Sequence, residues 1–237
     1  MSEPARAAEK PAGKAEDFID VYVSPAELFR RRIDGKFGHA LIVLIVISAI
    51  LFFLTKSAMG PLYEAEFARG MAANPNITPE QIEAGKKMAG VFGAIGVVVG
   101  IPIGALLLGL SVWLVGRILG ATVNYIQGVT IATFAFFPRL IEGITNAVQA
   151  LLLDESKLTS LHSVKLGVSR FLDPQAMGAV ALAFLGRVDL FTLWVTILVG
   201  VGLRQMGKIA TGQAALGAVL VWLVGSLPTL VPALMQK

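Results

Sequence analysis

Four polar residues recur at helical spacing inside an apolar stretch of the chain, from Gly128 to Leu153. In chain order they are Arg139, Glu142, Asn146 and Gln149, at steps of three, four and three residues. Such steps place all four on one face of a helix, where an arginine and a glutamate can pair. An arginine at the centre of a bilayer costs about 2.5–3.5 kcal/mol, so the pair is either a salt bridge that fixes packing or part of a polar path or ligand site.

A second pair of charges, Arg187 and Asp189, interrupts the apolar run between Ala176 and Leu203. This run is too long for one simple span, so it is either broken at these charges or one strongly tilted helix. We favour the break, with Asp189 as the N-cap of the second piece. Our hypothesis is that both charge pairs meet inside the protein as one charge-balanced network. A buried charge that keeps its desolvation cost without a partner would be strongly destabilising.

Sequence motifs typical of enzymes are missing from the chain. There is no His-Glu-x-x-His motif, no Gly-x-Ser-x-Gly elbow and no phosphate-binding loop. The chain has no cysteine, and its two histidines, His39 and His162, are far apart in sequence. We therefore expect no enzymatic activity, no metal site and no cofactor.

Composition indicates a polytopic membrane protein. Hydrophobic residues make up 55% of the 237 residues and charged residues 15%, and the mean hydropathy is +0.73. The net charge of +4 comes from basic residues beside the ends of apolar runs, which indicates membrane topology and not nucleic-acid binding.

The apolar runs predict an all-α bundle of about five transmembrane helices. The expected spans are His39–Leu54, Ala89–Leu119, Gly128–Leu153, a piece from Asp189 to Leu203, and Gly212–Leu234. We expect residues 1–17 to be a disordered cytoplasmic tail, residues 18–36 an interfacial amphipathic helix and residues 37–237 the five-span domain. A second amphipathic surface helix is expected between Asp154 and Asp173.

Glycines follow one face of the expected second span. They are Gly93, Gly96, Gly100 and Gly104, and small residues at this spacing let two helix backbones approach closely. We therefore expect this face to pack against a partner helix of the same chain or of a second copy. Ahead of this span, Thr78 and Gln81 match a capping box, which predicts a helix start at Pro79.

Basic residues near the span ends predict the orientation. Arg30, Arg31 and Arg32 precede the first span and are expected to contact anionic lipid headgroups. With five spans they share one side with Lys36, Arg117, Arg204 and Lys208, which predicts a cytoplasmic amino end and an external carboxyl end. We expect no signal peptide and a location in a bacterial cytoplasmic membrane.

The order of several short segments resembles the Yip family of multi-pass membrane proteins, in its prokaryotic type. These segments are VSPAELFRRRID ahead of the first span, LGATVNYIQ, FFPRL in the third span, and VDLFTLWVTILVGVGL. The resemblance covers roughly Ser24 to Leu234 and implies a five-span helical bundle with a cytoplasmic amino end. The Asp-Leu-Tyr-Gly-Pro motif of the eukaryotic branch is missing, so the resemblance does not imply that this protein recruits a GTPase.

Two functions from different classes remain open at this point. The first is a non-enzymatic membrane organiser or scaffold that binds lipid or partner proteins, or assembles with copies of itself. The alternative is a transporter of a small solute, ion or lipid that uses the polar face of the third span. Whether that face meets a cavity or a dry interface distinguishes the two.

Overall fold

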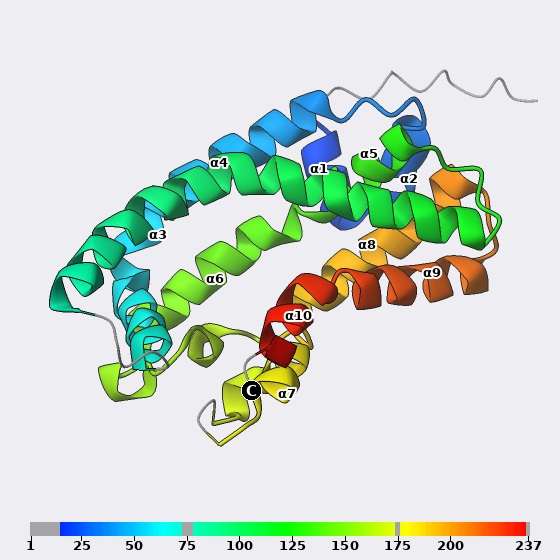
Figure 1. Cartoon of the computed structure of the whole chain (residues 1–237). Helices are drawn as coiled ribbons and strands as arrows, with labels where there is room; N and C mark the ends of the chain where they lie inside the picture. The colour runs from blue at the N-terminus through cyan, green and yellow to red at the C-terminus, as the bar shows by residue number, and fades with distance from the viewer. Residues whose placement is uncertain (1–14, 73–77, 174–175, 236–237) are drawn as a thin grey trace, which may run out of the picture.

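The computed structural model describes residues 15–72, 78–173 and 176–235, and these form an all-α bundle. Its α-helices are α1 (Asp17–Val23), α2 (Pro25–Arg31), α3 (Gly38–Ala72), α4 (Pro79–Ile118), α5 (Tyr125–Ala135), α6 (Pro138–Leu152), α7 (Ala179–Leu185), α8 (Leu190–Gly207), α9 (Thr211–Val224) and α10 (Leu227–Met235) (Figure 1). Most of the expected tail, residues 1–14, lies outside the described residues.

The long helices run between two ends of the bundle. At one end, the Gln127 side chain donates to the carbonyl oxygen of Ile33 and the Gln213 side chain to that of Leu119. The start of α3, the end of α4, the start of α5, the end of α8 and the start of α9 therefore meet here, and we call this the basic end. At the far end, the backbone N–H of Leu161 donates to Glu66 of α3. Over its described residues the chain runs five times between these ends.

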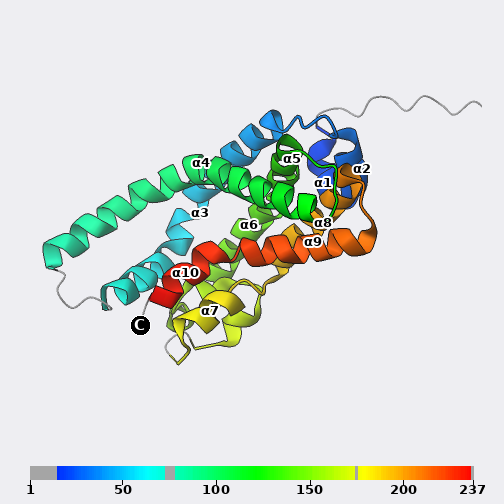
Figure 2. The ribbon, with the colours of Figure 1, turned by 45° about the vertical axis from the view of Figure 1, so that its right-hand side comes forward.

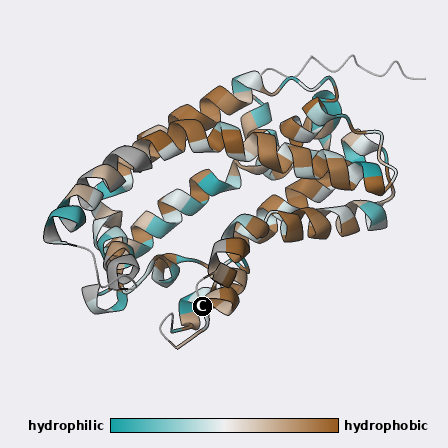
Figure 3. Cartoon of the chain, viewed as in Figure 1, coloured by the Kyte–Doolittle hydropathy of each residue, from teal (hydrophilic) through white to brown (hydrophobic). Residues whose placement is uncertain are grey.

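Four of these runs are long and apolar enough to cross a membrane, within the described residues. They are Gly38–Phe67, Gly93–Ile118, Leu190–Gly207 and Thr211–Met235. Brown, hydrophobic residues make up much of α4, α8 and α9 in Figure 3, while teal residues appear on α6 and toward the ends of the bundle. The prediction of an all-α polytopic bundle is confirmed.

The expected third span is divided into α5 and α6, which is why the candidate spans are one fewer than the five expected. Pro138 follows the turn at Phe136 and Phe137 and begins α6. A proline inside a helix lacks an N–H and clashes with the preceding turn, so a break just before Pro138 is the relaxed solution. The expected amphipathic face therefore belongs to α6 alone.

The first long helix, α3, is longer than the expected span His39–Leu54. Helix α3 continues to Ala72, and α4 begins at Pro79. The prediction for this start is confirmed, because Thr78 and Gln81 form a capping box. Both helices exceed the roughly 20 residues that a bilayer core requires, so α3 and α4 form a hairpin longer than the membrane is thick (Figure 2).

The second expected amphipathic helix has a different form in the structure. Between Asp154 and Asp173 the chain forms the 3-10 turns η1 (Glu155–Lys157), η2 (Leu161–Val164) and η3 (Val168–Phe171) instead of one α-helix. The segment pairs with neighbours, because Val168 N–H donates to the carbonyl oxygen of Val188. The segment 18–36 contains α2 and all of α1 except Asp17, and Val21, Leu28 and Phe29 of these helices are fully buried in the bundle core.

The glycine face of α4 lies close to other parts of the chain at two of its four positions. A Cβ added at Gly93 would come 2.9 Å from Cζ of Phe52 in α3, and one at Gly104 would come 3.5 Å from Cε2 of Phe136. A Cβ added at Gly96 or Gly100 would meet nothing within 4 Å, so these two glycines do not contact another described helix of the same chain. The close approach lies further along α4, where a Cβ on Gly109 would come 2.6 Å from Cα of Val129 in α5. Gly128 lies directly against the carbonyl oxygen of Gly109. The α4–α5 crossing therefore depends on Gly109 and Gly128, which the four-residue spacing did not single out.

Candidate functional site

An ionic cluster joins the first turn of α6 to the first turn of α8. Arg139 Nη1 lies 2.5 Å from Glu142 Oε2, and Arg139 Nη2 donates to Thr192 Oγ1 at 2.9 Å. Asp189 Oδ1 lies 4.0 Å from Arg139 Nη1. The structure therefore brings Arg139 and Glu142 of the first predicted pair and Asp189 of the second to one place, with the Thr192 hydroxyl between Arg139 and Asp189.

Asp189 begins α8 as predicted. Its carboxylate accepts from the backbone N–H groups of Phe191 and Thr192, and from the Thr192 hydroxyl at 2.5 Å. A side chain that accepts from the first free N–H groups is what defines an N-cap. The helix break at Arg187–Asp189 is confirmed, because α7 ends at Leu185 and α8 begins at Leu190.

Arg187 lies beside the cluster without joining its hydrogen bonds. Its Nε is buried and has no hydrogen-bond partner. This residue lies outside the four candidate spans, and burial, followed by the positive charge of Arg139, lowers the pKa of its guanidinium below the ordinary value, with Asp189 opposing.

The remaining polar residues of the α6 face take no part in the cluster. Asn146 Oδ1 is buried without a hydrogen-bond partner, and Gln149 is half-buried one turn further on. The sequence placed them on the face of Arg139 and Glu142, but the neighbouring α8 supplies Thr192 only at the first turn of α6.

Two of the three arginines at the end of α2 are held by carboxylates of α1. Arg31 and Arg32 both bind Asp17, and Arg31 also binds Asp20 at 2.6 Å. Arg30 pairs with Glu27 and stays largely exposed. The expected contact with lipid headgroups stays a prediction, and of the three arginines Arg30 is the one free enough to make it.

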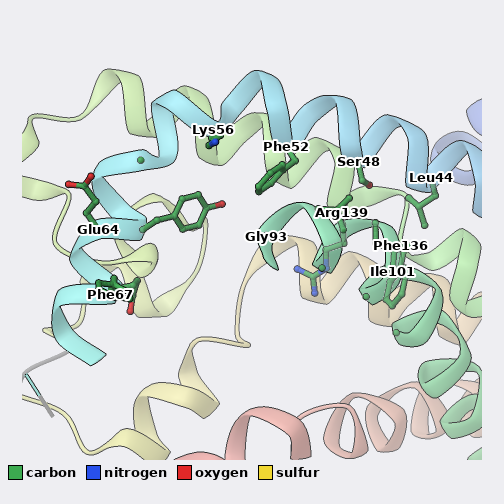
Figure 4. Close-up of a pocket in the computed structure, with 17 residues that line it drawn as sticks. Leu44, Ser48, Phe52, Lys56, Glu64, Phe67, Gly93, Ile101, Phe136 and Arg139 are labelled. Carbon is green, nitrogen blue, oxygen red and sulfur yellow. The ribbon is translucent and has the colours of Figure 1, made fainter. Parts of the chain in front are cut away.

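The first cavity, about 1110 Å³, lies between α3, α4 and the turn before α6 (Figure 4). Figure 4 shows Leu44, Ser48 and Phe52 of α3 along one side of it, with Phe136 and Arg139 at one end. All four glycines of the predicted packing face line this cavity: Gly93, Gly96, Gly100 and Gly104. Their lack of side chains leaves the space between α3 and α4 open.

A second cavity, about 860 Å³, lies on the α8 side of the cluster. Arg187 and Asp189 line it together with apolar residues that include Leu193 and Trp222. Arg139 lines the first cavity and Asp189 the second, so the ionic cluster stands between the two. Among the described residues no three His, Asp or Glu side chains are grouped as metal ligands.

Comparison with protein families gives one match, in which the Yip1 domain covers residues 19–231. The chain belongs to the Yip family. The Yip1 domain thus includes most of α1, all of α2, the ionic cluster and both cavities. No curated protein and no solved structure matches the chain.

Sequence reasoning missed three residues that shape this Yip1 domain. Thr192 completes the cluster, and Asp17 binds the α2 arginines. The Tyr22 hydroxyl donates to the carbonyl oxygen of Phe137 at 3.0 Å, across the break between α5 and α6. Burial raises the pKa of Tyr22, which keeps this hydroxyl protonated as a donor. The helical spacing of Thr192 from Asp189, at i+3, was the available signal for the first of these.

Proposed function

We propose that this Yip-family protein is a non-enzymatic membrane organiser that holds a lipid between α3 and α4. The first cavity carries the proposal. It is larger than the roughly 300–1,000 Å³ of common small-molecule sites, and most of its lining is apolar side chains and glycine. It lies between the candidate spans Gly38–Phe67 and Gly93–Ile118, where an acyl chain is the most abundant apolar ligand.

The ionic cluster favours an organiser over a solute pathway. Arg139, Glu142, Thr192 and Asp189 bond mainly to one another. A polar path for ions or water requires polar groups that face an aqueous cavity. The cluster lies half-buried or buried in a contact between α6 and α8, and the cavities that Arg139 and Asp189 line are otherwise mainly apolar. The cluster therefore serves best as a fixed polar contact beside the lipid.

Lipid transport is the second candidate, and one observation favours it. The cluster separates two mainly apolar cavities, so its opening could let a lipid move from one cavity to the other. Reconstituted vesicles with fluorescent lipid in one leaflet would decide this. Lipid transfer faster than in protein-free vesicles would favour the transporter, and an unchanged rate would favour the organiser.

Lipid that copurifies with the protein tests the organiser proposal. Gly100→Leu adds a side chain where the structure leaves open space, so it should fill part of the first cavity without a clash. The control is Gly143→Leu in α6, which also meets nothing within 4 Å but does not line the cavity. We expect mass spectrometry to find less bound lipid in Gly100→Leu only. Equal lipid in both variants would contradict the proposal.

The proposed orientation places the basic end in the cytoplasm of a bacterial cell. Arg117, Arg204 and Lys208 lie near helix termini that meet at this end, next to the α1–α2 segment with its three arginines. Lysine and arginine near span ends favour the cytoplasmic side. Contacts with partner proteins or with further copies of the chain remain a part of the organiser proposal.

A further inference from the structure

Two cavities of opposite polarity adjoin at the far end of the bundle. The second cavity, described above, is mainly apolar. A third cavity, about 380 Å³, is lined by polar residues that include Lys157, Ser160 and Ser169. Arg170 and Leu172 line both cavities, so the two spaces share a wall. A molecule with a compact polar head and an apolar tail matches this pair of spaces.

The positive charges of these cavities exceed the available negative charges. Arg170 and Arg187 form no ion pair with any described residue, and Nε of Arg187 is buried without a hydrogen bond. Asp189 is near Arg187, but its carboxylate already accepts from two backbone N–H groups and the Thr192 hydroxyl. A partly buried cation without a counter-charge is costly, so an anionic ligand would stabilise this arrangement.

Ser169 provides an independent sign of a polar ligand. Its side chain is 1% exposed, and Oγ has no hydrogen-bond partner. Buried hydroxyl groups are nearly always hydrogen-bonded, because an unsatisfied one costs about 1–3 kcal/mol. Ser169 precedes Arg170 in η3 and lines the third cavity, so a phosphate oxygen there would accept from its hydroxyl.

We propose that the adjoining second and third cavities together bind one anionic phospholipid. Its phosphate group lies at Arg170 and Ser169 in the third cavity, and an acyl chain follows Leu193 and Trp222 in the second. Arg187 lies beside the end of the acyl chain nearest the phosphate and supplies a second positive charge near the phosphate group. This site is separate from the cavity between α3 and α4, so it does not depend on the function proposed above.

Lipid titrations followed by native mass spectrometry test the site on the purified full chain. We expect phosphatidylglycerol to bind more tightly than phosphatidylcholine. Arg170→Gln should weaken phosphatidylglycerol binding by about tenfold, the loss expected for one charge-assisted hydrogen bond. Arg30→Gln is the matched control, because Arg30 is exposed on α2 and lines neither cavity. Gly100→Leu should also leave this binding unchanged, which separates the site from the first cavity.

Leu193→Trp is a second test of the site, to be used if the Arg170→Gln protein fails to fold. Leu193 is largely exposed and lines the second cavity, so a larger side chain should obstruct the acyl chain while both arginines stay in place. We expect weaker phosphatidylglycerol binding in this variant as well. The proposal is overturned if both variants bind like the unmodified protein, if phosphatidylcholine binds equally well, or if inorganic phosphate alone displaces the lipid fully.

Discussion

Removing the negative charge of Glu142 should destabilise the protein more than removing both charges of its ion pair. Glu142→Gln keeps the shape of the side chain but leaves Arg139 without its partner at 2.5 Å. Loss of a buried partner costs about 3–5 kcal/mol. The Arg139 side chain is 35% exposed and keeps its bond to Thr192, so we expect a smaller cost of about 2 kcal/mol. Arg139→Gln in the same chain should recover part of this loss.

The assay is a double-mutant cycle on the free energy of unfolding. Purified protein in mixed micelles can be unfolded with a denaturing detergent and followed by the fluorescence of its three tryptophans. We expect a coupling of about 1–2 kcal/mol between the two positions. Glu27 and Arg30 are the control pair, with the same i,i+3 spacing but side chains 64% and 60% exposed, and their coupling should stay below about 1 kcal/mol. An additive cycle at Arg139 and Glu142 would refute the network.

Three further predictions test the fold. Gly128→Ala should lower the free energy of unfolding by about 1–3 kcal/mol, because the added carbon would contact the backbone of Gly109. The control Gly143→Ala has open space and should be neutral or stabilising by up to about 1 kcal/mol. Equal melting temperatures of the two variants would contradict the close crossing of α4 and α5. Tyr22→Phe should cost about 1 kcal/mol, because Phe137 loses a hydrogen bond across the helix break; chemical unfolding measures this loss, and no loss would disprove the bond's contribution. A reporter active only in the cytoplasm should work after Lys208 and fail after Lys237, and activity at both sites would exclude the proposed orientation.

Local chemistry was sufficient to predict several features. The capping box at Thr78 and the N-cap at Asp189 each depend on residues within three positions of one another. The pairing of Arg139 with Glu142 also follows from one helical turn. Features of this kind are set by backbone geometry over a few residues, so they hold in almost any tertiary context.

Features that depend on distant residues could not be predicted in this way. Tyr22 and Phe137 are 115 positions apart in sequence, so their hydrogen bond required the fold itself. Asp17 was assigned to a disordered tail because its neighbours have little to bury, but the positive charges of Arg31 and Arg32 hold it in the structure. The glycine face of α4 was ambiguous for another reason. Small residues permit either a close crossing or an open cavity, and only the position of α3 decides between them.

The two helix breaks explain why charged residues lie together here. The turn before Pro138 and the turn before Leu190 both expose backbone groups that a continuous helix would pair. Asp189 satisfies N–H groups at the second break, Tyr22 donates to a carbonyl at the first, and Arg139 then neutralises Asp189. A polar cluster is therefore required by the broken helices whether or not it binds a ligand. The cavities on either side of it, with open space at Gly100 and an unpaired Ser169, are consequently the stronger indications of function.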